Sequence, residues 1–366
     1  MTLKSIAGLL LATAAMIAPL TAAAEAADME ALIAAAKQEG SVVAYWHSSR
    51  IAKAGEAFEA KYSIKVFGTK MTDAESTERV VREVEASNVQ ADIIGYDDGP
   101  RLVTELKPGA FVENYLPADL AGDIPAASQD PLVYLWQVTI IGYNTERYQS
   151  CPITNVWQLT EPEWAGRFHM LDPRLRSTQI QAFSAIEERA GELAAAYQEL
   201  YGKPLETTEK NAGIEFIKRL ASARPVLYNE DVEIAAAVGA RGQQNPPLGL
   251  YTLGRHREIE TKNLALGMCA LKPFQGINQP SYIQIVAGGP HPNAAKLLTH
   301  FLLTEEGVQP WTGDLGAYSS NPKLSSNPGN PFPNVEGWGT TLLVSDNAKV
   351  AERRQELLDF WITNNR

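Results

Sequence analysis

Short apolar runs alternate with amphipathic helical patterns along this chain, and this alternation restricts its fold more than any other feature. Ser41–Trp46 has the length and composition of a buried strand, and a helical pattern follows it at Ile51–Tyr62. The same two patterns recur at 64–67 and 72–87, and a third apolar run occupies 91–96. Strands separated by helices of about ten to fifteen residues form parallel sheets with helices on both faces. The first third of the chain is therefore predicted to be an α/β unit.

A second α/β unit is predicted after a long extended run at 132–144. The later strand patterns lie at 167–171, 225–228, 248–251, 264–274 and 282–286, and helical patterns fill 171–220. From His291 onward the pattern is mostly helical, apart from a loop rich in Pro, Gly, Asn and Ser between Tyr318 and Trp338. The chain has 366 residues, which is more than one compact domain usually holds. It is therefore predicted to form two α/β lobes, each built from non-contiguous segments.

The first 26 residues have the pattern of an export leader. Lys4 precedes an apolar run from Ile6 to Leu20, and small residues then lead to an A-x-A cleavage pattern at 24–26. The apolar run is too short to cross a bilayer comfortably, and no Cys stands just after it to carry a lipid. We expect residues 1–26 to be a signal peptide and the mature protein to be free in the periplasm.

Composition and motifs exclude several classes of function. The net charge of −11 argues against a nucleic-acid binder, which needs a basic face, although a local site can still hold an anion. The sequence has no G-x-S-x-G elbow, no H-E-x-x-H, no Walker loop and no close Cys/His cluster. Glu230 and Asp231 could act as acid and base in a hydrolase, but adjacent carboxylates point in different directions on most backbones. We expect a binding protein with no catalytic residues, cofactor or metal.

Polar residues follow the first predicted strand, at the edge of an α/β sheet where ligands bind. His47, Ser48, Ser49 and Arg50 lead directly into the helix at 51–62. A helix N-terminus offers free N–H groups and partial positive charge, and Ser hydroxyls with a guanidinium would complete an anion site. The alternative is a Ser cap beside a solvent-exposed Arg.

The second unit offers similar loops. Arg174, Ser177 and Thr178 open a helix after the strand at 167–171, and they suit an anion or a sugar hydroxyl unless Ser177 merely caps that helix. Glu230 and Asp231 follow the strand at 225–228. Their carboxylates could accept hydrogen bonds from sugar hydroxyls or an amine, or could cap the next helix.

Three further residues are candidates for lining the same site. Asp98 follows the strand at 91–96, where it could equally form a plain turn with the next two residues, Gly and Pro. Trp136 and Tyr251 could present aromatic faces to a ligand, although single residues of these types indicate a site less specifically than a loop does.

Two segments resemble extracellular solute-binding proteins of bacterial ABC importers, in the group that contains ferric-ion, thiamine and sugar-phosphate binders. The segment 287–307, AGGPHPNAAKLLTHFLLTEEG, resembles the late helix of that group, and GAYSSNP at 316–322 resembles the element after it. IGYNT at 141–145 is similar to the first inter-lobe strand, and 172–179 is similar to a P-x-x-S-x-T turn. The similarity covers nearly all of the chain after the leader.

This resemblance implies an α/β, two-lobed periplasmic-binding-protein fold with parallel-rich sheets and the ligand in the inter-lobe cleft. The implied chain crossings lie at 138–144 and 268–275. The boundaries that we expect are lobe I at 27–140, lobe II at 141–270, a return crossing into lobe I at 271–290, and C-terminal helices across the lobes and hinge at 291–366.

The two cysteines, Cys151 and Cys269, would then flank the crossings on the side of lobe II. A disulfide is chemically allowed in an exported protein, and we expect these residues to form one. The alternative is a pair of buried thiols that pack as small hydrophobes.

The resemblance also implies a function. We expect a monomeric binding protein that delivers a small anionic solute, a sugar phosphate or other organophosphate, to an ABC permease of the inner membrane. The alternative is a ferric-ion or ferric-complex binder. Ferric binders of the group offer an adjacent Tyr-Tyr pair, and no two tyrosines are adjacent in this chain.

Overall fold

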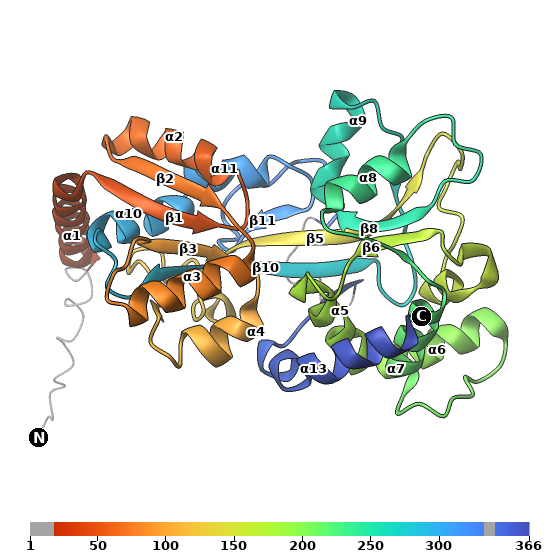
Figure 1. Cartoon of the computed structure of the whole chain (residues 1–366). Helices are drawn as coiled ribbons and strands as arrows, with labels where there is room; N and C mark the ends of the chain where they lie inside the picture. The colour runs from red at the N-terminus through yellow and green to blue at the C-terminus, as the bar shows by residue number, and fades with distance from the viewer. Residues whose placement is uncertain (1–17, 333–340, 366) are drawn as a thin grey trace, which may run out of the picture.

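The computed structural model describes residues 18–332 and 341–365, in which one curled sheet connects two lobes (Figure 1). The strand order along this sheet is β2-β1-β3-β10-β5-β8-β6-β7. The fold class predicted from the sequence, a two-lobed α/β fold with a parallel-rich sheet, is confirmed.

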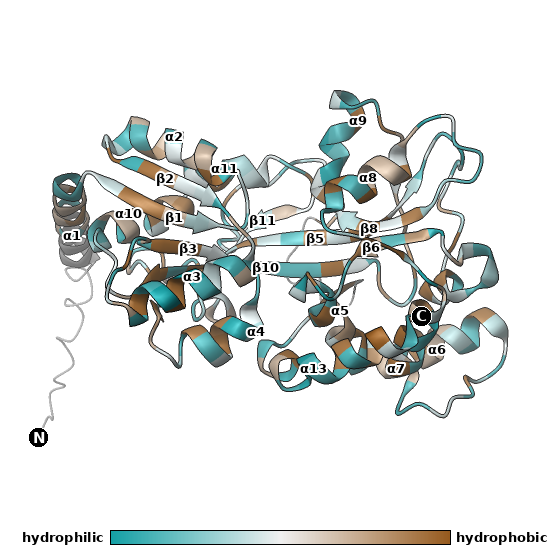
Figure 2. Ribbon diagram, in the orientation of Figure 1, coloured by the Kyte–Doolittle hydropathy of each residue, from teal (hydrophilic) through white to brown (hydrophobic). Residues whose placement is uncertain are grey.

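Lobe I contains the first parallel unit. Strand β1 (Ser41–Trp46) pairs in parallel with β2 (Lys65–Lys70) and with β3 (Ile93–Tyr96). Helices α2 (Ile51–Tyr62) and α3 (Asp73–Glu85) connect these strands. Figure 2 shows apolar stretches on β1 and β3, whereas α3 carries both apolar and hydrophilic stretches, as expected of a helix with one face against a sheet.

Two long antiparallel strands cross from one lobe to the other. They are β5 (Val133–Asn144) and β10 (Gly276–Val286), and the return strand thus begins just beyond the segment at 268–275 that the sequence suggested. The register slips by one residue where β10 passes Ser281 and Tyr282, so that Tyr134 of β5 is the extra residue of a β-bulge. Short strands extend the ladder: β4 (Val112–Glu113) and β12 (Leu342–Val344) on β10, and β9 (Leu266–Met268) and β11 (Ala317–Ser319) on β5.

Lobe II repeats the parallel arrangement on the other side of β5. Strand β6 (Phe168–Leu171) pairs in parallel with β7 (Val226–Tyr228) and with β8 (Leu248–Thr252). Its helices are α5 (Ser177–Glu188), α6 (Ala190–Tyr201), α7 (Ala212–Ser222), α8 (Asp231–Gly239) and α9 (Glu258–Thr261), with shorter turns η3 (Val156–Thr160), η4 (Pro162–Trp164) and η5 (Leu253–Arg257). Cys151 and Cys269 form a disulfide with their Cα atoms 5.1 Å apart, which confirms the predicted pairing.

The C-terminal part of the chain returns to both lobes. Helices α10 (Pro292–Leu302) and α11 (Glu305–Thr312) pack against α1 (Ala18–Glu39) and α2 of lobe I. Helix α13 (Asn347–Asn364) packs against α5 and α7 of lobe II and also reaches α4 (Gly99–Arg101). The turns η1 (Leu102–Leu106) and η2 (Ala126–Ser128) complete lobe I. Helix α1 comes directly before β1 in the chain. Most of the predicted leader, and the end of the loop at 318–338, lie outside the described residues.

Aromatic side chains fill the core of each lobe. In lobe I, Trp46 and Trp311 both meet the ring of Tyr134 edge-on, with ring centroids 5.6 Å apart in each pair. In lobe II, Trp361 of α13 lies against Phe183 of α5 with a centroid distance of 5.0 Å. These contacts bury large apolar surfaces and stabilise the core of each lobe. In the part of the chain that the structure describes, no helix is both long enough and apolar enough to span a bilayer.

Candidate ligand-binding cleft

A cavity of about 760 Å³ lies between the lobes, where the carboxyl ends of β1, β2 and β3 face those of β6, β7 and β8. This is the edge of an α/β sheet at which ligands bind. The sequence-predicted site residues that line this cavity are His47, Ser48, Ser49, Arg50, Asp98, Ser177, Thr178, Glu230 and Asp231. The loops chosen from the sequence thus meet in one place, although they come from both lobes.

Three predicted residues do not line the cavity. Arg174 forms an ion pair with Asp172 of its own turn, at 2.9 Å from Nε to Oδ1. Tyr251 is fully buried and its ring lies over Gly142 of β5, where a Cβ atom would collide with it. Burial raises the pKa of Tyr251, so its phenol is a neutral part of the core. Trp136 lies within β5, opposite Tyr318 of β11.

The N-terminus of α2 opens into the cavity without a side-chain cap. The N-cap residue, Arg50, makes no capping hydrogen bond with its side chain. The Ser48 hydroxyl accepts from the Arg50 N–H at 3.3 Å, and the Ser49 hydroxyl bonds to no other described residue. The Ile51 and Ala52 amides bond to the carbonyls of Ser48 and Ser49. The donors left without a described partner are therefore the Ser49 hydroxyl and the backbone N–H groups of Ser48 and Ser49, just before the helix, and these are available to a ligand.

Arg50 itself has a structural role that the sequence did not reveal. Its guanidinium donates to the carbonyl of Pro310 at 2.9 Å and pairs with the carboxylate of Asp314, both near the end of α11. These contacts tie the start of α2 to the C-terminal part of lobe I. Arg50 thus lines the cleft with most of its charge already compensated.

The N-terminus of α5 has the same uncapped character in lobe II. Its N-cap residue, Arg176, makes no capping bond, because a guanidinium has no acceptor for a helix N–H; it donates to the Asn229 carbonyl and to Glu230. The Ser177 and Thr178 hydroxyls bond to no other described residue, so the capping role considered for Ser177 is not the one that the structure shows. A second set of unsatisfied helix amides thus faces the cavity.

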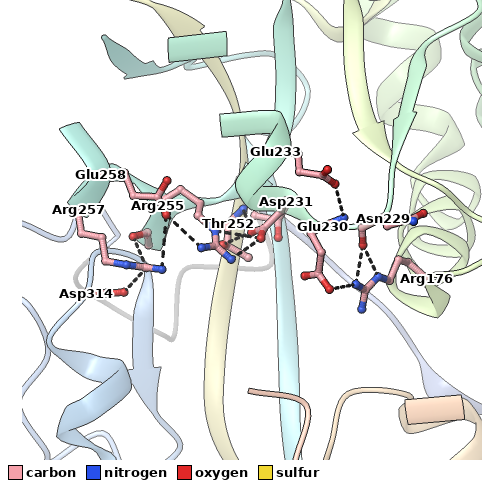
Figure 3. A network of polar contacts seen from close by, with 12 residues as sticks. Arg176, Asn229, Glu230, Asp231, Glu233, Thr252, Arg255, Arg257, Glu258 and Asp314 are labelled. Atoms are coloured by element: carbon pink, nitrogen blue, oxygen red, sulfur yellow. Dashed lines mark hydrogen bonds and ion pairs between the residues drawn. The ribbon is translucent and has the colours of Figure 1, made fainter. Parts of the chain in front are cut away.

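An arginine network organises the rest of the lobe II side (Figure 3). Arg255 donates to Asp231 through two nitrogens, at 2.9 and 2.6 Å, and to Glu258 at 3.2 Å. Burial alone would raise the pKa of Asp231, but Arg255 and the Thr252 hydroxyl hold it below its usual value. Arg257 extends the network to Asp314 of lobe I at 2.6 Å.

Three aspartates form the opposite side of the cavity, which we call the acidic wall: Asp73, Asp97 and Asp98. Burial, reinforced by Asp97 and Asp98, raises the pKa of Asp73 well above its usual value. Asp98 is paired with Arg354 of α13 at 2.8 Å. Asp97 accepts a hydrogen bond from the Ser281 hydroxyl of β10 at 2.6 Å.

The β-bulge in the crossing strands orients one edge of this wall. Its extra residue, Tyr134, has a hydroxyl that accepts from Trp46 Nε1 at 3.2 Å and lies 3.5 Å from His47 Nε2. The other ring nitrogen of His47 lies 3.7 Å from Asp97 Oδ1. The bulge thus holds His47 beside the acidic wall.

Several residues of the cleft were not among the predicted site residues. Asp73 begins α3 directly after β2, and Asp97 follows β3, so the rule that ligands bind at carboxyl ends of strands could have found both. The pairings of Arg255 with Asp231 and of Arg257 with Asp314 carry no local signal, because these partners are separated by 24 and 57 residues in the sequence. Among the described residues, no group of three or more His, Cys, Asp or Glu side chains is arranged to hold a metal ion.

No protein-family model and no curated protein sequence matches this chain. Iron-bound HitA from Pseudomonas aeruginosa superposes with a TM-score of 0.69 at 17% identity, covering 89% of this chain and 99% of HitA. AfuA from Actinobacillus pleuropneumoniae, a periplasmic binding protein solved with fructose-6-phosphate, gives 0.67 at 20% identity, covering 89% and 98%. The substrate-binding protein of an ABC transporter from Agrobacterium tumefaciens gives 0.70 at 16% identity, covering 89% and 94%.

At these identities the similarity establishes the architecture and leaves the solute open. The shared features are two α/β lobes, the strands that join them and a cavity between them. The chain therefore has the two-lobed fold of the periplasmic substrate-binding proteins of ABC transporters.

Proposed function

We propose that this protein is a periplasmic solute-binding protein that captures a small anionic solute in the inter-lobe cleft and delivers it to an ABC permease. One observation carries the proposal: the uncapped N-termini of α2 and α5, one from each lobe, open into the same cavity. Helix N-termini are suited to phosphate and carboxylate groups, because free N–H donors and the helix dipole both favour negative charge.

The solute class that we propose is an organophosphate, a sugar phosphate being one example. The hydroxyls of Ser49, Ser177 and Thr178 supply additional donors beside the helix amides. A ligand held by both helix starts would bridge the lobes and favour the closed arrangement over the open one. AfuA, which has the same fold, was solved with such a solute.

Ferric ion is the alternative cargo, because HitA has the same fold and was solved with iron. No observation in this cleft favours it. Tyr251, the tyrosine that the sequence suggested as a cleft residue, is buried in the core and does not line the cavity. Addition of ferric citrate is expected to give no phenolate-to-iron absorption band; a strong band with stoichiometric uptake would favour iron over the organophosphate.

Calorimetry with a panel of sugar phosphates and their parent sugars tests the organophosphate proposal. The phosphates should bind and the parent sugars should bind more weakly. Ser49→Ala should weaken phosphate binding by about 1–3 kcal/mol, because ligand oxygens lose a donor in a site without bulk water. Ser222→Ala, which removes an exposed hydroxyl of α7 far from the cavity, is the matched control and should bind normally. Equal binding of sugars and their phosphates would contradict the proposal.

A further inference from the structure

The acidic wall carries more negative charge than its protein neighbours neutralise. Asp98 has a full partner in Arg354, whose Nη1 lies 3.0 and 2.8 Å from its two carboxylate oxygens. Asp97 has the neutral Ser281 hydroxyl, and Asp73 accepts the Asp97 backbone N–H at 3.2 Å. Neither of these two carboxylates forms an ion pair with a described Lys or Arg side chain.

The cations that face the wall from other elements are held elsewhere. Lys70, at the end of β2, lies 3.8 Å from Glu230, and Arg176 of lobe II is bonded to the same carboxylate. Arg101 is paired with Glu105 on its own turn at 2.7 Å. The pKa of Asp73 is raised, first by burial and then by the neighbouring charges of Asp97 and Asp98, and the more distant Arg176 offsets this only in part.

A second and independent observation points to the same place. The His47 side chain is only 9% exposed, and its Nδ1 atom has no hydrogen-bond partner among the described residues. That atom faces Asp97 Oδ1 across 3.7 Å, which is too long for a hydrogen bond. Buried polar atoms are normally satisfied, so an unpartnered one in a residue that lines the cavity marks a position where a ligand group can bond once the side chain adjusts.

We propose that the solute carries an amino group as well as its anionic group, and that Asp73, Asp97 and His47 bind this group as an ammonium. The inference rests on the proposed function, since the anionic group is placed at the helix starts. The solute class thereby narrows to small amino-bearing phosphate esters or phosphonates. An ammonium has three donors and one positive charge, which match two uncompensated carboxylates and a neighbouring ring nitrogen.

The opposite electrical character of the two subsites gives the solute one orientation. A phosphate at the acidic wall would face Asp73 and Asp97, and an ammonium at the starts of α2 and α5 would face the positive ends of two helices. Both of these reversed placements are repulsive. The acidic wall therefore contributes to solute specificity, because it favours amino-bearing solutes and disfavours solutes with a second anionic group.

Calorimetry with three related probes tests this inference: O-phosphoethanolamine, which has both groups, ethyl phosphate, which lacks the amine, and ethanolamine, which lacks the phosphate. We expect phosphoethanolamine to bind about tenfold or more tightly than ethyl phosphate. In Asp97→Asn, which keeps an acceptor for Ser281 but removes the charge, the ratio of these two affinities should fall towards one. Glu78→Gln removes the same charge from an exposed position on α3 outside the cleft and should keep the wild-type ratio.

The outcomes separate this inference from the proposed function. Equal affinity of phosphoethanolamine and ethyl phosphate would overturn the amino subsite while leaving the anion site in place. A wild-type ratio in Asp97→Asn would also overturn it, provided that the variant melts cooperatively. Binding of ethanolamine together with absence of binding by both phosphates would overturn the proposed anion site itself.

Discussion

The two sides of the cleft use charge in opposite ways. In lobe II the charged side chains are bonded to one another: Arg255 to Asp231 and Glu258, and Arg176 to Glu230. In lobe I the acidic wall leaves Asp73 and Asp97 without a cationic partner, and only Asp98 has one. Side chains that are paired with one another fix the positions of their loops. Unpaired charges of one sign are instead free to bind a ligand group of the opposite sign. A cleft can therefore contain equal numbers of positive and negative side chains and still have one side that attracts a cation.

The largest expected loss of stability comes from a substitution on the lobe II side of the cleft, where the charged side chains are paired. Asp231→Ala leaves Arg255 in a site where its side chain is only 21% exposed and removes its two-nitrogen contact. Loss of one partner of a buried ion pair costs about 3–5 kcal/mol, and the remaining bond to Glu258 places this variant near the lower end. Urea unfolding measures the loss. Glu260→Gln, an exposed change in α9, should stay within about 0.5 kcal/mol; an equal loss in both variants would show that the pairing is not responsible.

The disulfide should give the next largest effect and should act mainly on lobe II. Replacing both Cys151 and Cys269 with serine is expected to lower the free energy of unfolding by about 2–4 kcal/mol, because the bridge restricts a long loop of the unfolded chain. Amide exchange should accelerate near β9 and in the segment after β5 more than in β1 and β3. Uniform acceleration in both lobes, or two free thiols in the unreduced protein, would contradict this prediction.

Asp73→Asn should change the stability by less than the two preceding variants, and it should stabilise the protein where they destabilise it. Because the pKa of Asp73 is raised on folding, the folded state holds this proton more tightly than the unfolded state does. The contribution of Asp73 to stability is therefore complete below its unfolded pKa and is lost as the pH rises through the folded pKa. The variant should melt at a higher temperature than the wild type near pH 8 and equal it near about pH 4. If the wild type were more stable than Asp73→Asn near pH 8, the negative charge of the acidic wall would have to be neutralised by other groups of the protein.

The smallest change in stability is expected from an exposed ion pair that joins the two lobes across the cleft. Lys70 and Glu230 approach to 3.8 Å across the lobes, but their side chains are 54% and 43% exposed. Exposed ion pairs contribute about 0–1 kcal/mol and weaken with salt. Lys70→Ala should therefore change the urea midpoint only slightly. A loss well above 1 kcal/mol would show that this pair links the two sides as firmly as the buried network does.

The parts of the molecule that follow local rules were predictable from sequence. Helix α2 has the predicted bounds, Ile51–Tyr62, and β1 has the predicted bounds too, because apolar periodicity and flanking turn residues determine both. The loops at Ser48 and Ser177 were found because every parallel strand ends at the same edge of its sheet.

The parts that depend on distant partners were not predictable in this way. Arg50 suggested a ligand contact, but it is paired with Asp314, 264 residues further along the chain. Tyr251 had the composition of a cleft residue, yet Gly142 leaves room for its ring inside the core. The charge imbalance of the acidic wall arises only when Asp73 and Asp97, from two successive strand ends, are brought together in the fold.

The bulge in the crossing strands has a mechanical consequence. Tyr134 is the residue that β5 gains there, and it touches Trp46 and His47, while Ser281 on the facing strand bonds to Asp97. Bending between the lobes must pass through this same ladder, and a bulge is where a ladder changes its twist most readily. The bulge therefore connects the strands that join the lobes to His47 and Asp97, and we expect a change at these two residues to be transmitted to those strands.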